Sequence, residues 1–235
     1  MINKITILTI SIFTYLIIFN CASTKNYEVT NLISVNNLDT CNGNYNDAIE
    51  LIQNKSIEEI TLNEIAQLRC LKYQTEPVVN NEITENYKKA IADSNFEKII
   101  IYGKELLKND FANPYLHNAV AHAAKALGNT VELDYHSNYI LKHFQSFSAL
   151  GNGNSIESPL QAFSIGEEYD WLSAMGYKRG NQSKVVNNGR HFDVHKVKNK
   201  DGKSSSVYFD ITGYWFNFHK MFTDTTNNKK TIIFR

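Results

Sequence analysis

Three histidines of this 235-residue sequence lie where they could meet inside a folded protein. His117 falls on one helical stripe of apolar residues, and His136 and His143 fall on a second stripe beyond a turn at Gly128-Asn129. At a rise of about 1.5 Å per residue, His117 would differ in height from either of the other two by roughly 6 Å. Either pair could therefore reach one metal ion or one acidic group.

The alternative for these histidines is a place among the hydrogen-bonded polar groups of the core. A zinc site needs three or four ligands with supporting groups around them, and the sequence offers no further ligands in register with His117 and His136. We therefore expect no metal site and favour the core interpretation. His117, His136 and His143 are kept as candidates for a functional site.

Other residue types that could do chemistry are isolated in the sequence. Glu167 and Glu168 are adjacent, and neighbouring helix positions point about 100° apart. They fit the start of a helix, where negative charge is favourable, better than a paired-carboxylate site. Ser155 and Ser183 lack the glycine-flanked turn of a nucleophile elbow. We expect neither a catalytic residue nor a cofactor.

Helical spacing dominates residues 45–150, which would position the histidines. Thr61 and Asn129 are each followed three residues later by glutamate, as in a capping box. The turns at Ser94-Asn95 and Gly128-Asn129 are 34 residues apart, which is the period of tetratricopeptide repeats. We expect tetratricopeptide-like antiparallel helical hairpins in this region.

Residues 151–235 follow a different pattern. Ser164 and Glu167 have the spacing of a capping box for one short helix that ends near Gly176. Asp201-Gly202 is typical of a hairpin turn between two strands. The expected strands are Leu160–Phe163, Phe192–Val197, Val207–Ile211 and 231–234. The second region is thus predicted to be a small antiparallel β-sheet with one helix, and the chain to be of the α+β class.

The first residues have the pattern of an export signal. Lys4 is followed by an apolar run over residues 5–19 and then by Asn20 and Cys21. The run is short for a membrane-spanning helix, which needs about 20 apolar residues. The residues before Cys21 resemble a bacterial lipobox, although Asn20 stands where glycine or alanine is usual. We expect residues 1–20 to be a cleaved signal peptide and Cys21 to carry lipid. An uncut anchor helix and a plain secreted protein are the alternatives.

The polar residues 21–44 are interpreted as a tether between the lipid and the folded chain. If Cys21 is lipidated, Cys41 and Cys70 remain. An oxidising periplasm would permit a bridge between them, and two buried free thiols are the alternative.

The charges are balanced overall and uneven along the chain. Lys+Arg and Asp+Glu number 24 each, which argues against a nucleic-acid partner. Residues 178–203 contain eight basic residues against Asp193 and Asp201. This stretch could meet an anionic lipid or polysaccharide surface, and solvated hairpin faces are the simpler interpretation.

The loop at residues 151–155 heads a series of short motifs in a fixed order. His117 and His136 precede it, and Glu167-Glu168-Tyr169 and Phe192-Asp193-Val194 follow it. Over roughly residues 45–215 this order resembles an uncharacterised family of exported proteins from Bacteroidota, a domain of unknown function with a tetratricopeptide-like helical first part. The resemblance implies the fold and export, and no activity. Asn152 stands where the family's loop has an acid, which argues against a metal site there.

The expected function is that of a membrane-anchored lipoprotein that acts as a protein or peptide interaction module of the bacterial cell envelope. By analogy with the family, we expect it on the periplasmic side of the outer membrane. One alternative is an envelope hydrolase or metal-binding protein that uses the inward-facing histidines. Another is a polyanion binder that uses residues 178–203.

Overall fold

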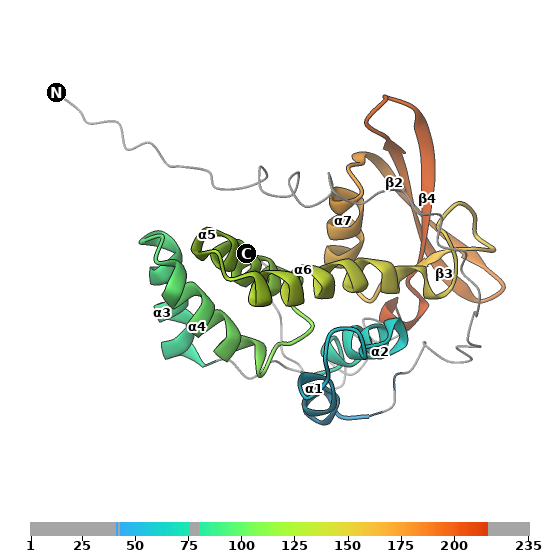
Figure 1. Ribbon diagram of the computed structural model, residues 1–235. Helices are drawn as coiled ribbons and strands as arrows, with labels where there is room; N and C mark the ends of the chain where they lie inside the picture. Colours follow the sequence, from blue (N-terminus) through green and yellow to red (C-terminus); the bar gives the residue numbers. More distant parts are fainter. Residues whose placement is uncertain (1–40, 42, 76–79, 216–235) are drawn as a thin grey trace, which may run out of the picture. The chain divides into compact units, whose positions relative to one another are not determined.

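The computed structural model describes residues 41, 43–75 and 80–215, and these belong to one compact unit that spans residues 32–235. Helices come first and a mixed β-sheet follows (Figure 1), which confirms the predicted α+β class. The expected signal peptide, Cys21, most of the tether and the expected strand at 231–234 lie outside the described residues.

The first two helices begin at capping residues, and a disulfide ties the segment before the first helix to the second helix. Helix α1 (Tyr45–Gln53) begins after Asn44, whose side chain accepts the backbone N–H of Asn46. Helix α2 (Leu62–Lys72) begins with the predicted capping box of Thr61 and Glu64. Cys41 and Cys70 form a disulfide with their Cα atoms 6.0 Å apart, which decides between the two alternatives for these thiols.

Four further helices pack on one another in sequence order, and each begins at an asparagine cap. They are α3 (Asn81–Ala92), α4 (Phe96–Leu107), α5 (Pro114–Leu127) and α6 (Thr130–Gln145). Gly103 permits the close approach of α4 and α5, because a Cβ atom there would lie 2.6 Å from the Val120 side chain. The helix succession is as predicted, and the likeness to tetratricopeptide repeats stays a prediction.

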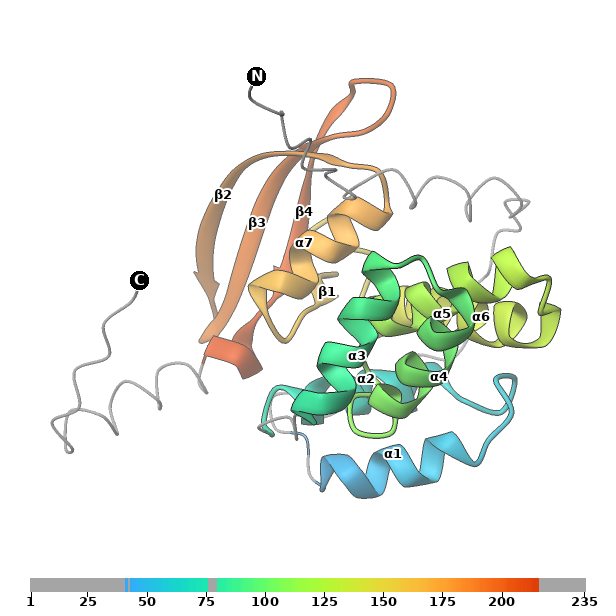
Figure 2. The same cartoon turned by 90° about the vertical axis from the view of Figure 1, so that its left-hand side faces the viewer.

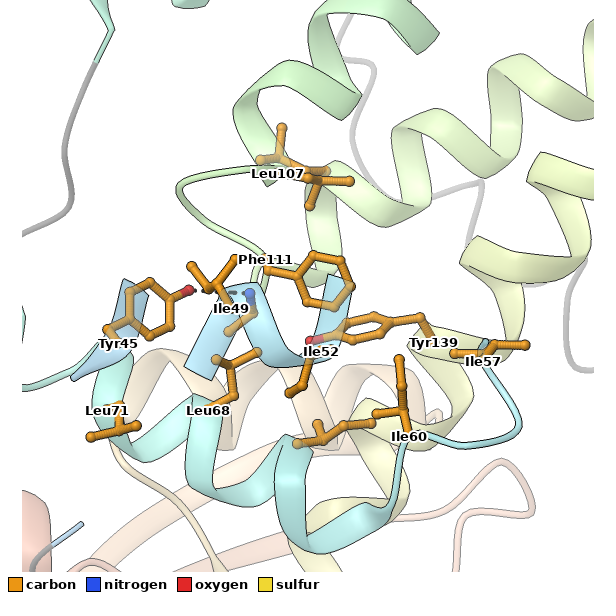
Figure 3. Packing of buried hydrophobic residues seen from close by; sticks show 13 residues of the cluster. Tyr45, Ile49, Ile52, Ile57, Ile60, Leu68, Leu71, Leu107, Phe111 and Tyr139 are labelled. Atoms are coloured by element: carbon orange, nitrogen blue, oxygen red, sulfur yellow. Dashed lines mark hydrogen bonds between the residues drawn. The ribbon is translucent and has the colours of Figure 1, made fainter. Parts of the chain in front are cut away.

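The helices share an apolar core in which α1 and α2 meet the loop after α4 and the middle of α6 (Figure 3). The Tyr45 hydroxyl accepts the backbone N–H of Ala112 at 3.2 Å, which satisfies a polar group in this core. The largest members of the cluster are Tyr45, Phe111 and Tyr139, together with Ile49, Ile52, Ile60, Ile65, Leu68 and Leu71.

The sheet has the strand order β1-β4-β3-β2 within the described residues. Its strands are β1 (Leu160–Gln161), β2 (Lys178–Asn187), β3 (Arg190–Lys198) and β4 (Ser204–Asp210). The β2–β3 and β3–β4 pairs are antiparallel, whereas β1 runs parallel to β4. The predicted antiparallel sheet is therefore a mixed one, antiparallel in two of its three strand pairs and parallel between β1 and β4. After β1 the chain passes through α7 and the β2–β3 hairpin before β4 pairs with β1. On this path β4 runs in the same direction as β1.

The three predicted strands that the structure describes differ in extent from their predictions, β3 and β4 by at most three residues at an end, and one further strand was missed. Strand β1 stops at Gln161 instead of Phe163, because the Phe163 N–H donates to the Glu167 carboxylate at 2.9 Å instead of extending a ladder. Strand β2 was not predicted at all. It is joined to β3 by Asn188-Gly189, whose φ angles of 49° and 75° are those required for a tight hairpin turn.

Helix α7 (Ile165–Ala174) lies across one face of the sheet (Figure 2). The Ser164 side chain caps it by accepting the Glu167 N–H, as predicted. Trp171 packs edge-on against Phe209 of β4 with ring centroids 5.9 Å apart. The helix thereby shields the side of the sheet that carries Asp193, His195 and Phe209.

Arg69 of α2 is buried at the point where the helices meet the sheet region. Its Nε and Nη2 donate to the two carboxylate oxygens of Glu167 at 2.9 and 2.8 Å. Nη1 donates to Ser146 Oγ, in the 3-10 helix η3 (Ser146–Ala149), and Nη2 also donates to the Gln161 carbonyl. The guanidinium lies 3.5 Å from the centroid of the Phe147 ring. One side chain thus ties α2 to η3, β1 and α7.

Replacement of Arg69 by methionine should lower the free energy of unfolding by about 3–5 kcal/mol, because Glu167 would be left buried without a counter-charge. The double variant Arg69→Met/Glu167→Gln should recover part of this loss, because a neutral amide is cheaper to bury. Urea unfolding followed by circular dichroism measures both, with the exposed Lys98→Met as control. A loss below about 1 kcal/mol for Arg69→Met would contradict the role given to this residue.

Candidate functional site

The structure brings His117 of α5 and His136 of α6 together in the interior. Their Nδ1 atoms lie 2.8 Å apart. The second nitrogen of His117, Nε2, lies 2.9 Å from the Phe111 carbonyl oxygen. The second nitrogen of His136 lies 3.2 Å from a carboxylate oxygen of Glu132, which also forms an ion pair with Lys104 of α4. A chain of polar contacts therefore crosses α4, α5 and α6.

The acceptors at the two ends of this chain fix where the protons lie. The Phe111 carbonyl can only accept, so His117 Nε2 donates to it, and Nδ1 of a neutral His117 carries no proton. His136 Nδ1 must then donate to His117, which leaves Nε2 of a neutral His136 without a proton toward Glu132. Two neutral rings thus satisfy two of the three contacts, and a third proton would charge the pair.

Burial opposes that third proton. It holds the pKa of His117 well below its ordinary value, and the neighbouring His136 adds to the effect. Burial likewise lowers the pKa of His136 to about 4, although Glu132 acts in the opposite direction. We therefore assign both rings as neutral at pH 7, with the lone pair of His136 Nε2 facing Glu132.

His143 lies apart from this pair. The ring of Tyr139 stacks on His117 with 3.7 Å between centroids, and its centroid lies 6.3 Å from that of His143. Burial lowers the pKa of His143 strongly, with Arg69 as the next cause. Its Nδ1 atom is buried and has no hydrogen-bond partner in the described part of the chain.

The described residues contain no group of three or more His, Cys, Asp or Glu side chains that could hold a metal ion. The Nδ1 atoms of His117 and His136 contact each other, so they do not point together at a position that a metal ion could occupy. The pair therefore fits a hydrogen-bonded link between helices better than a metal centre.

A second buried cluster, between α7 and the sheet, was missed by sequence reasoning. His195 Nε2 lies 2.6 Å from Glu168 Oε2, and both side chains are almost fully buried. Burial raises the pKa of Glu168 to about 7, opposed by the hydrogen bond from His195 and supported by the charge of Asp193. Asp193 in turn accepts Gln182 Nε2 at 2.8 Å. The only signal was the alternation of Asp193 and His195 along one strand face.

Glu167 and Glu168 start α7 as predicted, and they do not form a carboxylate pair. Glu167 reaches Arg69 and Glu168 reaches His195 on the other side of the helix. Their separate directions agree with the 100° argument from the sequence. Their pairing with Arg69 and His195 was not predicted, because both partners are distant in the chain.

The basic stretch at residues 178–203 covers β2, which is exposed, and β3, which is largely buried. All ten residues of β2 are exposed. The guanidinium of Arg179 lies 4.2 Å from the Tyr169 ring centroid, and the Lys184 ammonium lies 3.3 Å from the Trp215 ring centroid. These contacts hold two positive charges in place. Arg190 is instead paired with the buried Asp210.

The buried histidines should make the protein less stable in acid. Since the pKa values of His117, His136 and His143 are lowered in the folded state, the unfolded chain binds more protons below about pH 6.5, and the free energy of unfolding falls from pH 7 to pH 5. Glu168 has a raised pKa and acts in the opposite sense over the same window.

His143→Leu removes one of these three imidazoles, and it also removes a nitrogen without a partner. The fall in stability between pH 7 and pH 5 should then be smaller by up to about 2 kcal/mol. Urea unfolding at both pH values measures the difference, and His122→Gln, which replaces an exposed histidine, is the matched control. An unchanged or steeper pH dependence in His143→Leu would refute the assignment.

Comparison with known proteins identifies a family and no individual relative. The DUF4919 family, a domain of unknown function, matches residues 70–219. This range contains the histidines, α7 and the whole sheet, and it starts one residue after Arg69. Neither a search of curated proteins nor a search of solved structures found a match. The chain belongs to the DUF4919 family of domains of unknown function.

Proposed function

We propose that this chain is a lipid-anchored, non-enzymatic interaction module of the bacterial cell envelope, attached through Cys21 and facing the periplasm from the outer membrane. The support for the anchor is the sequence itself, in which Lys4 and an apolar run lead directly to Cys21. Two or more acyl chains on one cysteine suffice for stable membrane attachment.

The observation that carries the non-enzymatic part is the burial of the groups that could do acid–base chemistry. His117, His136, His143, Glu168 and His195 are each at most 3% exposed. Each of them except His143 is engaged with another polar group of the interior. A substrate would have to part α5 from α6, or α7 from the sheet, to reach them. Binding of a partner protein at the surface requires no such separation of helices or of α7 from the sheet.

The disulfide supports export. Bridges such as Cys41–Cys70 form and persist in oxidising compartments, of which the periplasm is one. Within the described residues, no helix combines the length and the apolar character needed to cross a bilayer.

Cys21→Ser should abolish incorporation of labelled fatty acid and move the protein from the membrane fraction to the soluble fraction, because the lipid is the proposed anchor. Asn20→Gly is the matched control: it restores the usual residue before the cysteine and should keep both label and membrane attachment. Retention of Cys21→Ser in the membrane fraction would show that residues 2–20 act as an uncut anchor instead.

The interaction itself is tested by crosslinking in intact cells with the lipidated chain. We expect discrete crosslinked species in the envelope fraction that are lost when a tenfold excess of unlabelled chain competes. Absence of any crosslinked species under conditions that crosslink an envelope control complex would count against the proposed function.

A further inference from the structure

Strand β2 lies at the edge of the sheet, and its outer side has no paired strand among the described residues. Strand β2 is the last strand in the order β1-β4-β3-β2 and, in the described part of the chain, pairs only with β3. It is ten residues long and exposed throughout. The outer edge of such a strand presents unpaired N–H and C=O groups that can pair with another chain.

Part of this edge is protected against pairing and part is not. A bulge between Arg179 and Gln182 interrupts the register with β3, and bulges of this kind turn an edge away from partners. From Gln182 to Asn187 the register is continuous. Val185 and Val186, which are 37% and 60% exposed, lie in this regular part. The open edge is therefore a regular segment of six residues with apolar side chains near its end.

Strand β2 carries three positive charges, and of these only Lys184 has an acidic residue, Asp193, opposite it in the register with β3. Residues 171–192 contain no aspartate or glutamate, while β2 carries Lys178, Arg179 and Lys184. Lys178 lies directly opposite Lys198 in the register with β3, an arrangement of like charges that costs stability. An anionic side chain placed beside β2 would relieve this repulsion and gain the attraction of the other two cations.

We propose that the open edge of β2 binds an extended acidic segment of a partner protein, which adds to the sheet as a further strand. Main-chain hydrogen bonds would supply much of the affinity, and alternate side chains would supply the specificity. The segment would carry carboxylates on the face of Arg179 and Lys184 and apolar residues on the opposite face, toward Val185. This inference rests on the proposed function and names the partner chemistry for it.

A second copy of this chain is a poorer occupant of the same edge. Antiparallel pairing of two β2 strands would set two identical basic segments side by side, and like charges across such an interface oppose association. The aromatic contacts of Arg179 and Lys184 with Tyr169 and Trp215 also hold these cations in place before any partner arrives. An acidic strand meets a positive edge that is already formed, which lowers the ordering cost of binding.

The test uses the purified lipidated chain in detergent and three labelled ten-residue peptides with capped ends. One alternates glutamate and valine, one has the same sequence with alternate backbone nitrogens methylated, and one alternates lysine and valine. We expect the glutamate peptide to bind by fluorescence anisotropy. Backbone methylation and the lysine sequence should each weaken binding at least about tenfold.

The matched variants are two charge reversals of equal size. Arg179→Glu/Lys184→Glu should weaken binding of the glutamate peptide at least about tenfold. Lys98→Glu/Lys125→Glu reverses two exposed lysines on the helices and should leave it unchanged. Circular dichroism and thermal unfolding establish that both variants are folded.

Three results with the purified chain, and one in intact cells, would overturn the inference. The methylated peptide could bind as well as the unmethylated one and be displaced by polyphosphate, which would indicate a general polyanion surface. The chain could sediment as a dimer that excludes the peptide, or no peptide could bind at all. In intact cells, a partner still crosslinked by Arg179→Glu/Lys184→Glu refutes this surface and keeps the proposed function. If the wild-type chain crosslinks to no partner, the proposed function itself is refuted.

Discussion

The guanidinium of Arg69 is a permanent charge without access to water, and much of the fold is arranged to satisfy it. Its hydrogen bonds end on Glu167, Ser146 and the Gln161 carbonyl, which belong to α7, η3 and β1. The Ser146 hydroxyl in turn donates to the His143 carbonyl at 2.6 Å, at the end of α6. Because an unpaired buried charge costs several kcal/mol, these segments must stay together. The helices and the sheet region are therefore held as one folded body by an interaction that spans 98 residues of sequence.

The same constraint explains why so many ionisable groups in the interior of the described part of the chain are committed to contacts with one another. Glu167 is committed to Arg69, and its neighbour Glu168 is committed to His195 on the opposite side of α7. His117 and His136 link α5 to α6 through one hydrogen bond between rings. Each of these groups serves to position an element. What remains for recognition is the surface, where β2 combines positive charge with an edge that pairs with no other strand among the described residues.

Local signals in the sequence predicted the helices well. The pairings between residues that are distant in the chain were not predicted. Thr61, Asn129 and Ser164 mark helix starts through contacts within three residues, and the approach of His117 to His136 follows from helix rise on both sides of one turn. Strand β2 escaped because all its residues are exposed and no apolar alternation marks it; Asn188-Gly189 was the missed hairpin signal. The parallel entry of β1 and the pairs of Arg69 and Glu168 with distant partners leave no local trace.

Amide hydrogen exchange on the lipidated full-length chain tests most directly the claim that the buried charges unite the fold and leave β2 as the free edge. Residues 62–72, 146–149 and 160–167 should exchange slowly and open together, with one common free energy, because Arg69 joins them. The outward amides of 182–187 should exchange fast, and those of β3 slowly. Independent opening of 62–72 and 160–167, or protection of 182–187 equal to that of β3, would contradict this claim.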